Sequence, residues 1–239
     1  DAPITWHGWS PRNYGRSYRG GVDLMTALTK SINTVPVRLS RELGTDKVAA
    51  MAKAMGVETP LRTDKTMALG TSEVTVLDQA TAYGVFMTGG YSTRRHGISQ
   101  IMNYKGDVLY DFWRDEPAPT QVMSEQAAAS MNQILTQVPV WGTGRRAKLD
   151  GITTAGKTGT TQAYRDAWFA GYTGNFSAAV WFGNDDYTST NRMTGGSLPA
   201  ATFKRIMDFA HRGIELKPIP GIENPLPEDD KTGSPAVAS

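Results

Sequence analysis

The sequence predicts an α+β fold in which helices flank an antiparallel sheet. Two short runs rich in aromatic and β-branched residues, 167–172 and 178–182, are joined by Thr173-Gly174-Asn175, which is typical of a β-hairpin. A Thr-rich segment at 157–161 precedes them, so three antiparallel strands are available in a row. Elsewhere, apolar residues recur at helical spacing between capping residues and glycines.

The first three helices are predicted by residues that start and stop them. Asp23 can cap a short helix. Pro36 suits the first turn of a second helix, which stops at Gly44. Thr45 can then cap a third helix, which is closed by Gly56.

Two longer helices and a hairpin are predicted further along the chain. One helix starts at Thr75, whose partner three residues on is Asp78, and it stops at Gly89-Gly90. Another starts at Ser124 and keeps one apolar stripe as far as Val138. Between them, residues 98–113 are typical of a hairpin that turns at Lys105-Gly106.

The C-terminal part of the chain predicts a final helix and then a tail. Ser197 opens a helix with Phe203, Ile206 and Met207 on one face. Beyond it the sequence becomes rich in proline. We therefore expect one domain over residues 1–216 and a disordered tail over 217–239.

Composition excludes several classes of function. The 239 residues have a hydrophobic fraction of 39% and a formal charge of +2, so most of the chain can fold and no basic patch predicts a nucleic-acid partner. Because there is no cysteine, disulfides, thiolate catalysis and Cys-based metal sites are excluded. The three histidines lie far apart in sequence and have no carboxylate at ligand spacing, so we expect neither a metal nor a cofactor.

The segment GITTAGKTGTT, residues 151–161, supports two incompatible interpretations. Gly151 to Thr158 fits the phosphate-loop pattern, in which Lys157 would reach phosphates and Thr158 would hold magnesium. That mechanism needs a buried strand before the loop and a helix after it. Residues 145–150 are too charged for such a strand, and Gly159 is a poor helix start.

The second interpretation takes Lys157-Thr158-Gly159 as the K-T-G triplet of penicillin-recognising serine enzymes. Such a triplet needs an ammonium and a hydroxyl on an edge strand, and the glycine lets a substrate backbone lie close. A second copy, Lys231-Thr232-Gly233, lies in the proline-rich tail, and we assign it no role. Far upstream, Ser31-Ile32-Asn33 lies between two predicted helices, where a loop can aim Ser and Asn side chains at an edge strand.

At these residues the chain resembles the transpeptidase domain of class A, bifunctional penicillin-binding proteins. The similar stretches come in the order of that family and extend over about residues 1–212: VDLMTALTKSINTVPVRL, LGTSEVTVLDQATAYGVFMTGG, VPVWGTGRRA, GKTGTTQAYRDAWFAGYT and VWFGNDDYTSTNRMTGGSLPAATFKRIM. The resemblance implies the penicillin-binding transpeptidase fold, which is similar to that of serine β-lactamases. It also implies that an N-terminal part of this fold lies outside the chain.

The chain departs from the family at the nucleophile. That family carries it in an S-x-x-K motif upstream of S-x-N, and no S-x-x-K occurs in these 239 residues. The resemblance implies that this segment, a glycosyltransferase domain and a membrane anchor precede Asp1. It further implies a location on the periplasmic or extracellular face of the cytoplasmic membrane, and a chain that is inactive by itself.

The resemblance implies acyl transfer on peptidoglycan stem peptides that end in D-Ala-D-Ala. Ser31 would pass a proton to the leaving amine, Asn33 would bond the substrate amide, and Lys157 would tune the proton network. Thr158 and Thr160 would hold the terminal carboxylate, and the N–H of Thr160 would supply half of an oxyanion hole.

Substrate binding is thereby assigned to Thr158, Gly159 and Thr160, with β-lactams as inhibitors of the complete site. Other interpretations stay open at this point: a phosphate-loop nucleotide-binding protein, a non-catalytic module that recognises stem peptides or β-lactams, and a serine β-lactamase. From local sequence alone, Ser31 and Asn33 could also be simple caps of the helix near Thr34.

Overall fold

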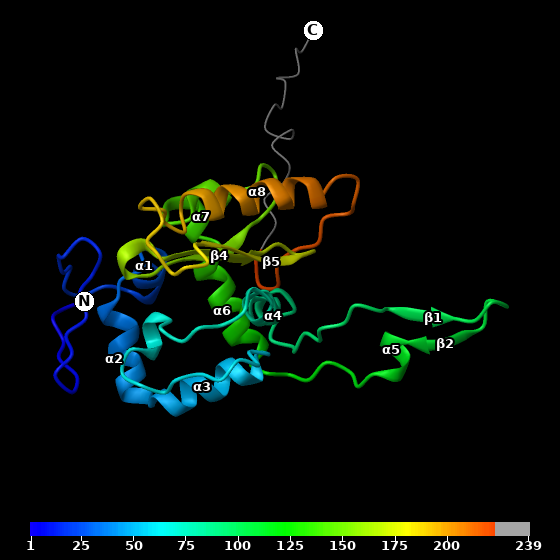
Figure 1. Ribbon diagram of the computed structural model, residues 1–239, viewed down its shortest axis with the longest axis horizontal. Helices are drawn as coiled ribbons and strands as arrows, with labels where there is room; N and C mark the ends of the chain where they lie inside the picture. The colour runs from blue at the N-terminus through cyan, green and yellow to red at the C-terminus, as the bar shows by residue number, and fades with distance from the viewer. Residues whose placement is uncertain (223–239) are drawn as a thin grey trace, which may run out of the picture.

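A three-stranded antiparallel sheet lies at the centre of the computed structural model, which describes residues 1–222 (Figure 1). Its strands are β3 (Ala155–Thr160), β4 (Asp166–Tyr172) and β5 (Ser177–Gly183), in the spatial order β3-β4-β5. The β4–β5 hairpin turns at residues 173–176, as the sequence predicted. Strand β3 pairs only with β4 within the sheet, so its other edge is not covered by a strand.

Helices cover both faces of this sheet and make three layers (Figure 1). On one face lie α8 (Leu198–Ala210) and the short α7 (Val138–Trp141). On the other face lie α4 (Val76–Met87) and α6 (Glu125–Leu135), with α1 (Leu24–Thr29) beside α6.

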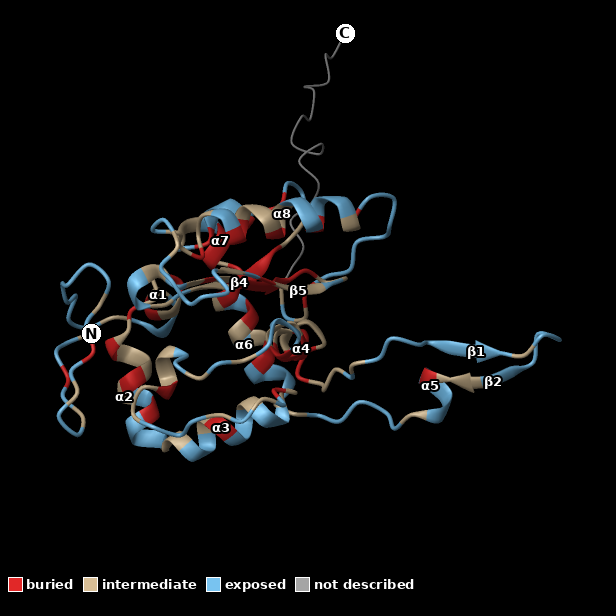
Figure 2. Ribbon diagram, viewed as in Figure 1, coloured by how far each residue is buried: buried red, intermediate tan, exposed pale blue. Residues whose placement is uncertain are grey.

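Strand β4 is buried on both faces because each face packs against helices (Figure 2). Phe169, which is 0% exposed, packs against Phe203 and Met207 of α8. Tyr172, also 0% exposed, points to the opposite face and packs near Leu135 of α6. Successive side chains of a strand alternate between faces, so these two residues anchor the two halves of the core.

The remaining elements lie around this centre. Helices α2 (Thr34–Leu43) and α3 (Thr45–Ala54) form a layer below α4 in Figure 1. Strands β1 (Gln100–Met102) and β2 (Val108–Asp111) and helix α5 (Phe112–Asp115) form an arm that extends away from the body. Three short 3₁₀ helices complete the described residues: η1 (Met67–Leu69), η2 (Arg145–Ala147) and η3 (Gln162–Tyr164).

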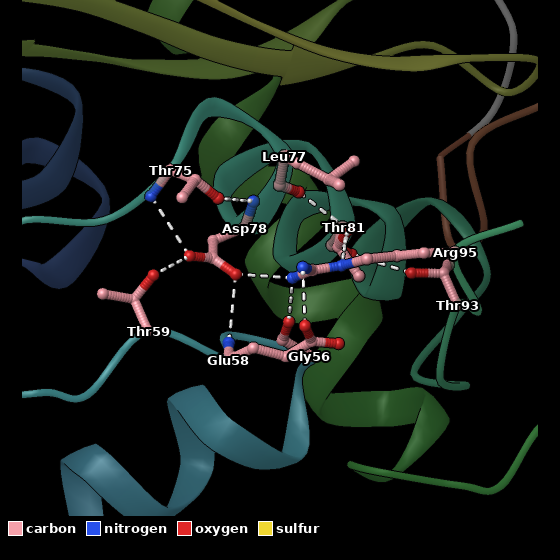
Figure 3. A network of polar contacts seen from close by, with 9 residues as sticks. All are labelled: Gly56, Glu58, Thr59, Thr75, Leu77, Asp78, Thr81, Thr93 and Arg95. Carbon is pink, nitrogen blue, oxygen red and sulfur yellow. Dashed lines mark hydrogen bonds and ion pairs between the residues drawn. The ribbon is translucent and has the colours of Figure 1, made fainter.

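The predicted start of α4 is confirmed as a capping box. Thr75 Oγ1 accepts a hydrogen bond from the Asp78 N–H at 3.0 Å, and the Asp78 carboxylate accepts one from the Thr75 N–H at 3.1 Å. Figure 3 shows that Asp78 also binds residues outside its helix: Arg95 at 2.5 Å, the Glu58 N–H at 3.0 Å, and the hydroxyl of Thr59. Asp78 therefore ties α4 to the segment after α3 and to the base of the arm.

The structure corrects the predicted helix that starts at Ser124. That helix, α6, ends at Leu135, and Val138 opens the separate helix α7. Pro139 lies in the first turn of α7, where its missing N–H costs nothing, whereas a continuous helix would have required that N–H.

The first residues that we assigned to the tail lie against the domain. Ile219 is only 1% exposed and packs in the same cluster as Tyr172, and the Pro220 carbonyl accepts a hydrogen bond from the Asn132 side chain at 2.9 Å. Residues 223–239, including the second copy at Lys231, lie outside the described residues. The domain limits that we predicted therefore stay a prediction.

Candidate active site

Ser31 occupies the turn that ends α1, in a conformation that usually selects glycine. Its φ is +56°, its N–H donates to the Leu28 carbonyl at 3.1 Å, and the Ile32 N–H donates to the Ala27 carbonyl at 2.8 Å. This pair of bonds is the Schellman motif, in which the left-handed position is normally Gly. A serine at this position costs about 1 kcal/mol of backbone strain, so local folding does not explain the hydroxyl.

Asn33 precedes α2 without capping it through its side chain. Its Nδ2 donates to the Arg12 carbonyl at 2.7 Å, and its backbone N–H donates to Asn13 Oδ1 at 3.0 Å. The interpretation of Ser31 and Asn33 as simple caps of α2 is therefore wrong. The amide of Asn33 instead ties the S-x-N turn to the N-terminal segment.

Lys157 extends from the uncovered edge strand towards this turn. Its Nζ donates to Ser31 Oγ at 2.9 Å and to the Thr158 carbonyl at 3.0 Å, and it lies 3.5 Å from Thr158 Oγ1. Two segments that are 126 residues apart in sequence thus meet through one hydrogen bond.

Burial lowers the pKa of Lys157 to about 8. Within residues 1–222 no ion pair involves this lysine, so its charge is balanced by hydroxyl and carbonyl oxygens rather than by a carboxylate. At neutral pH most molecules keep the cation, but the proton is held less tightly than on an exposed lysine. Lowered pKa values of this kind are common at functional sites.

The uncovered edge of β3 presents backbone donors beside Lys157. The Thr161 N–H donates to the Asp166 carbonyl at 3.1 Å and so points towards β4. Gly159 and Lys157 precede Thr161 by two and four residues, so their N–H groups point towards β4 as well. In an antiparallel pair this alternation directs the N–H groups of Thr158 and Thr160 away from β4, towards the uncovered edge. The Thr160 hydroxyl accepts a hydrogen bond from the Gly195 N–H at 3.0 Å.

The phosphate-loop interpretation is wrong. Gly156, Lys157 and Thr158 lie inside strand β3, and Gly156 is buried opposite Gly171 of β4. A Cβ on Gly156 would lie 2.7 Å from the Phe169 ring, so this glycine serves sheet packing. A phosphate loop needs an open turn followed by a long helix, whereas a 3₁₀ turn and strand β4 follow here.

Thr143, whose role the sequence did not indicate, lies between the end of α1 and strand β3. Its backbone N–H donates to the Thr29 carbonyl at 3.3 Å, and its hydroxyl lies 2.6 Å from Thr158 Oγ1. The glycines at 142 and 144 were a signal of a tight turn, but they did not indicate what that turn contacts.

A second missed contact joins the N-terminal segment to the loop after β3. The hydroxyls of Tyr14 and Tyr164 lie 3.0 Å apart, although the two residues are 150 positions apart. Sequence spacing could not have indicated this pair.

Neither a metal cluster nor a membrane helix occurs in the described part of the chain. No three His, Cys, Asp or Glu side chains of residues 1–222 are grouped so that they could hold a metal ion. In the same range, no helix has the length and apolarity that crossing a bilayer requires.

Comparison with known proteins agrees with the fold. The family model described as the penicillin binding protein transpeptidase domain matches residues 1–208. The chain therefore belongs to the penicillin-binding protein transpeptidase family, and the resemblance that we drew from the sequence is confirmed.

Its relatives include class A penicillin-binding proteins. The chain is 35% identical over 217 residues to penicillin-binding protein 1B of Vibrio cholerae, with 87% of this chain and 27% of that protein covered. It is 33% identical over 232 residues to penicillin-binding protein 1A of Neisseria flavescens, with 92% and 29% covered. The chain thus spans less than a third of the length of these relatives.

Solved structures share the fold, which confirms the predicted fold class. PonA1 of Mycobacterium tuberculosis in complex with penicillin V superposes with a TM-score of 0.81 at 25% identity, covering 94% of this chain and 68% of that one. Penicillin-binding protein 1A of Haemophilus influenzae gives a TM-score of 0.77 at 22% identity, covering 95% of this chain and 39% of that one.

Proposed function

We propose that this chain forms two walls of a serine acyl-transfer site that cross-links peptidoglycan. The substrates are stem peptides that end in D-Ala-D-Ala, and the reaction is D,D-transpeptidation. The observation that carries the proposal is the 2.9 Å hydrogen bond between Lys157 Nζ and Ser31 Oγ, which joins the K-T-G strand to the S-x-N turn.

The proton path of the reaction passes through Ser31. A nucleophilic serine attacks the penultimate D-Ala carbonyl, and the lysine of its S-x-x-K motif takes the serine proton. Ser31 delivers a proton to the leaving amine, and the terminal D-Ala departs. Lys157 donates to Ser31 Oγ and so stabilises negative charge on that oxygen while the proton moves.

The edge of β3 binds the substrate. Thr158 and Thr160 hold the terminal carboxylate, and Gly159 leaves room for the substrate backbone. The N–H of Thr160 donates to the carbonyl oxygen that becomes an oxyanion, and the N–H of the nucleophile supplies the other donor. Asn33 accepts from the substrate amide through Oδ1, because its Nδ2 is already bonded to Arg12.

The rest of the full-length protein completes this site in the proposal. The S-x-x-K segment, a glycosyltransferase domain and a membrane anchor are its partners within the same polypeptide. The complete protein works on the outer face of the cytoplasmic membrane, where peptidoglycan is assembled, and β-lactams acylate it. The 239 residues alone are not acylated, because they contain no S-x-x-K.

A non-catalytic recognition module is the second candidate, since the two walls could bind a stem peptide without reacting. It differs from the first in what happens to the ligand. Recognition leaves a β-lactam intact and exchangeable, whereas acyl transfer opens the ring and leaves it covalently attached.

The test is labelling of the full-length protein with a fluorescent penicillin, followed on a denaturing gel. We expect a covalent band from the parent, and a loss of at least tenfold in labelling rate from Ser31→Ala and from Lys157→Ala, because each removes a partner in the proton path. Lys204→Ala is the matched control, because this lysine lies in α8 and pairs with Asp150, whose side chain is 95% exposed.

Variants at Ser31 and Lys157 that label as fast as the parent would remove both residues from the mechanism. A parent protein that retains penicillin only without a covalent bond would favour the recognition module instead.

A further inference from the structure

We propose that Thr143 is a positioning residue that sets the Thr158 hydroxyl to donate to a substrate carboxylate. This inference rests on the proposed function and deepens it, because it names how an anionic group is selected at the K-T-G strand.

Thr143 contacts both walls of the site. Its N–H donates to the carbonyl of Thr29, two residues before Ser31, at 3.3 Å. Its hydroxyl lies 2.6 Å from Thr158 Oγ1, one residue after Lys157. A single residue thus links the S-x-N turn to the K-T-G strand.

Close packing fixes the position of the Thr143 backbone. A Cβ on Gly142 would lie 2.7 Å from the Thr29 carbonyl oxygen, and one on Gly144 would lie 2.9 Å from the Phe169 ring. A Cβ on Gly196 would lie 2.3 Å from the Thr143 carbonyl oxygen. Such approaches are possible only with glycine, so this turn is held between α1, β4 and the segment before α8.

The residues before Thr143 are also attached to the S-x-N turn. Lys30, next to Ser31, donates from Nζ to the Trp141 carbonyl at 2.7 Å and lies 4.9 Å from the centre of the Trp141 ring. The segment that leads into Thr143 is therefore held against the residue next to Ser31.

The hydroxyl pair has one arrangement that favours an anion. Two hydroxyls 2.6 Å apart share one hydrogen bond, so one of them donates and the other accepts. When a carboxylate approaches, the Thr158 hydroxyl donates to it, and the Thr143 hydroxyl donates to Thr158 Oγ1. Hydrogen bonds in such a chain polarise one another, so Thr158 becomes a stronger donor.

A neutral ligand gains less from this chain of hydrogen bonds than an anion does. An ester oxygen carries no full charge, and hydrogen bonds to charged groups are about twice as strong as neutral ones. Thr143 should therefore raise reactivity towards carboxylate ligands and leave the corresponding esters almost unaffected.

The experiment measures second-order acylation rate constants of the full-length protein with benzylpenicillin and with its methyl ester. We expect Thr143→Val to lower the benzylpenicillin rate about threefold to tenfold, the size of one lost hydrogen bond, and to change the ester rate less than about twofold. Thr143→Ser keeps the hydroxyl and should react with benzylpenicillin as the parent does.

A double variant tests whether Thr143 acts through Thr158. Thr143→Val combined with Thr158→Val should lose no more benzylpenicillin rate than Thr158→Val alone, because the two hydroxyls form one unit. Equal losses for penicillin and ester, or losses that add in the double variant, would overturn the inference. A parent that benzylpenicillin does not acylate would instead overturn the proposed function.

Discussion

Ser31 shows at the scale of one residue how the backbone conformation and the residue type can disagree. The end of α1 needs a left-handed residue, and glycine would adopt φ +56° without strain. The chain has serine there, and its hydroxyl reaches Lys157 at 2.9 Å. Strained residues that persist are common at functional sites, because the surrounding structure holds them in place.

Lys157 carries a prediction about pH and stability. Its pKa falls from an ordinary value of 10.5 to about 8 in the folded protein because of burial. Between these two values the unfolded chain binds more protons, so the free energy of unfolding should rise as pH rises from 8 to 10. At pH 7 the full cost of burying the cation is present.

We therefore expect Lys157→Met to be more stable than the parent at pH 7 by roughly 2 kcal/mol, an advantage that shrinks towards pH 10. Urea unfolding at pH 7, 8, 9 and 10 measures the difference. Lys53→Met, at an exposed position in α3, is the control and should differ little from the parent at any of these pH values. A constant difference for Lys157→Met would contradict the prediction.

At the scale of elements, Asp78 joins α4 to the segment after α3 and to the base of the arm. Burial alone would raise the pKa of Asp78, but hydrogen bonds from Thr59, the Glu58 N–H, Arg95 and the Thr75 N–H outweigh burial and hold this pKa well below its usual range. The network in Figure 3 therefore depends on the charged carboxylate. It fixes α4, whose other end packs against the sheet beside Tyr172.

We expect Asp78→Ala to lower the free energy of unfolding by about 3 kcal/mol, because it removes the buried carboxylate that pairs with the partly buried Arg95 and leaves that cation only the exposed Glu58 as an ion partner. The contribution of this carboxylate should be complete above about pH 4 and should decline as pH falls below it, since the folded pKa is lowered. Urea unfolding between pH 2.5 and 7 measures both effects.

The matched control is Glu116→Ala, which breaks a pair with Arg94 whose side chains are both 37% exposed. Surface pairs of this kind contribute less than about 1 kcal/mol, so this variant should stay close to the parent. An Asp78→Ala variant as stable as Glu116→Ala would show that the network does not hold the elements together.

At the scale of the whole molecule, the arm is separate from the body that forms the site (Figure 1). The arm is held by its own contacts: β1 pairs with β2, and the His96 and Phe112 rings stack with their centres 3.7 Å apart. At its base, backbone hydrogen bonds join the segment at 90–92, which leads into the arm, to the segment at 120–123, which leaves it. Several large apolar side chains of the arm are exposed, including Ile101, Met102 and Tyr104.

We expect replacement of residues 98–115 by a short Gly-Ser linker to change the melting temperature of the protein by less than about 3 °C, because the removed contacts are internal to the arm. The labelling rate with fluorescent penicillin should also stay at the parent value. Arg95→Ala, at the base that the linker variant keeps, is the contrasting variant and should lower the melting temperature more. An unfolded linker variant would show that the arm supports the body.

Local features were the predictable part of the fold. The caps at Asp23, Thr75 and Ser124 and the β4–β5 turn are confirmed, since each depends on hydrogen bonds between residues a few positions apart. The end of α6 was predicted too late, because the apolar stripe continues past the break before Pro139. The spacing of apolar residues does not indicate where one helix ends and the next begins.

Most helices and strands, the two short motifs and the family were predictable from the sequence, because these depend on neighbouring residues and on residue identity. The packing of distant segments was needed to show that Lys157 contacts Ser31, that Thr143 lies between Thr29 and Thr158, and that Gly156 lies inside a strand. The reason is physical: each of these facts depends on how distant segments pack around a shared core, and no single segment specifies that packing.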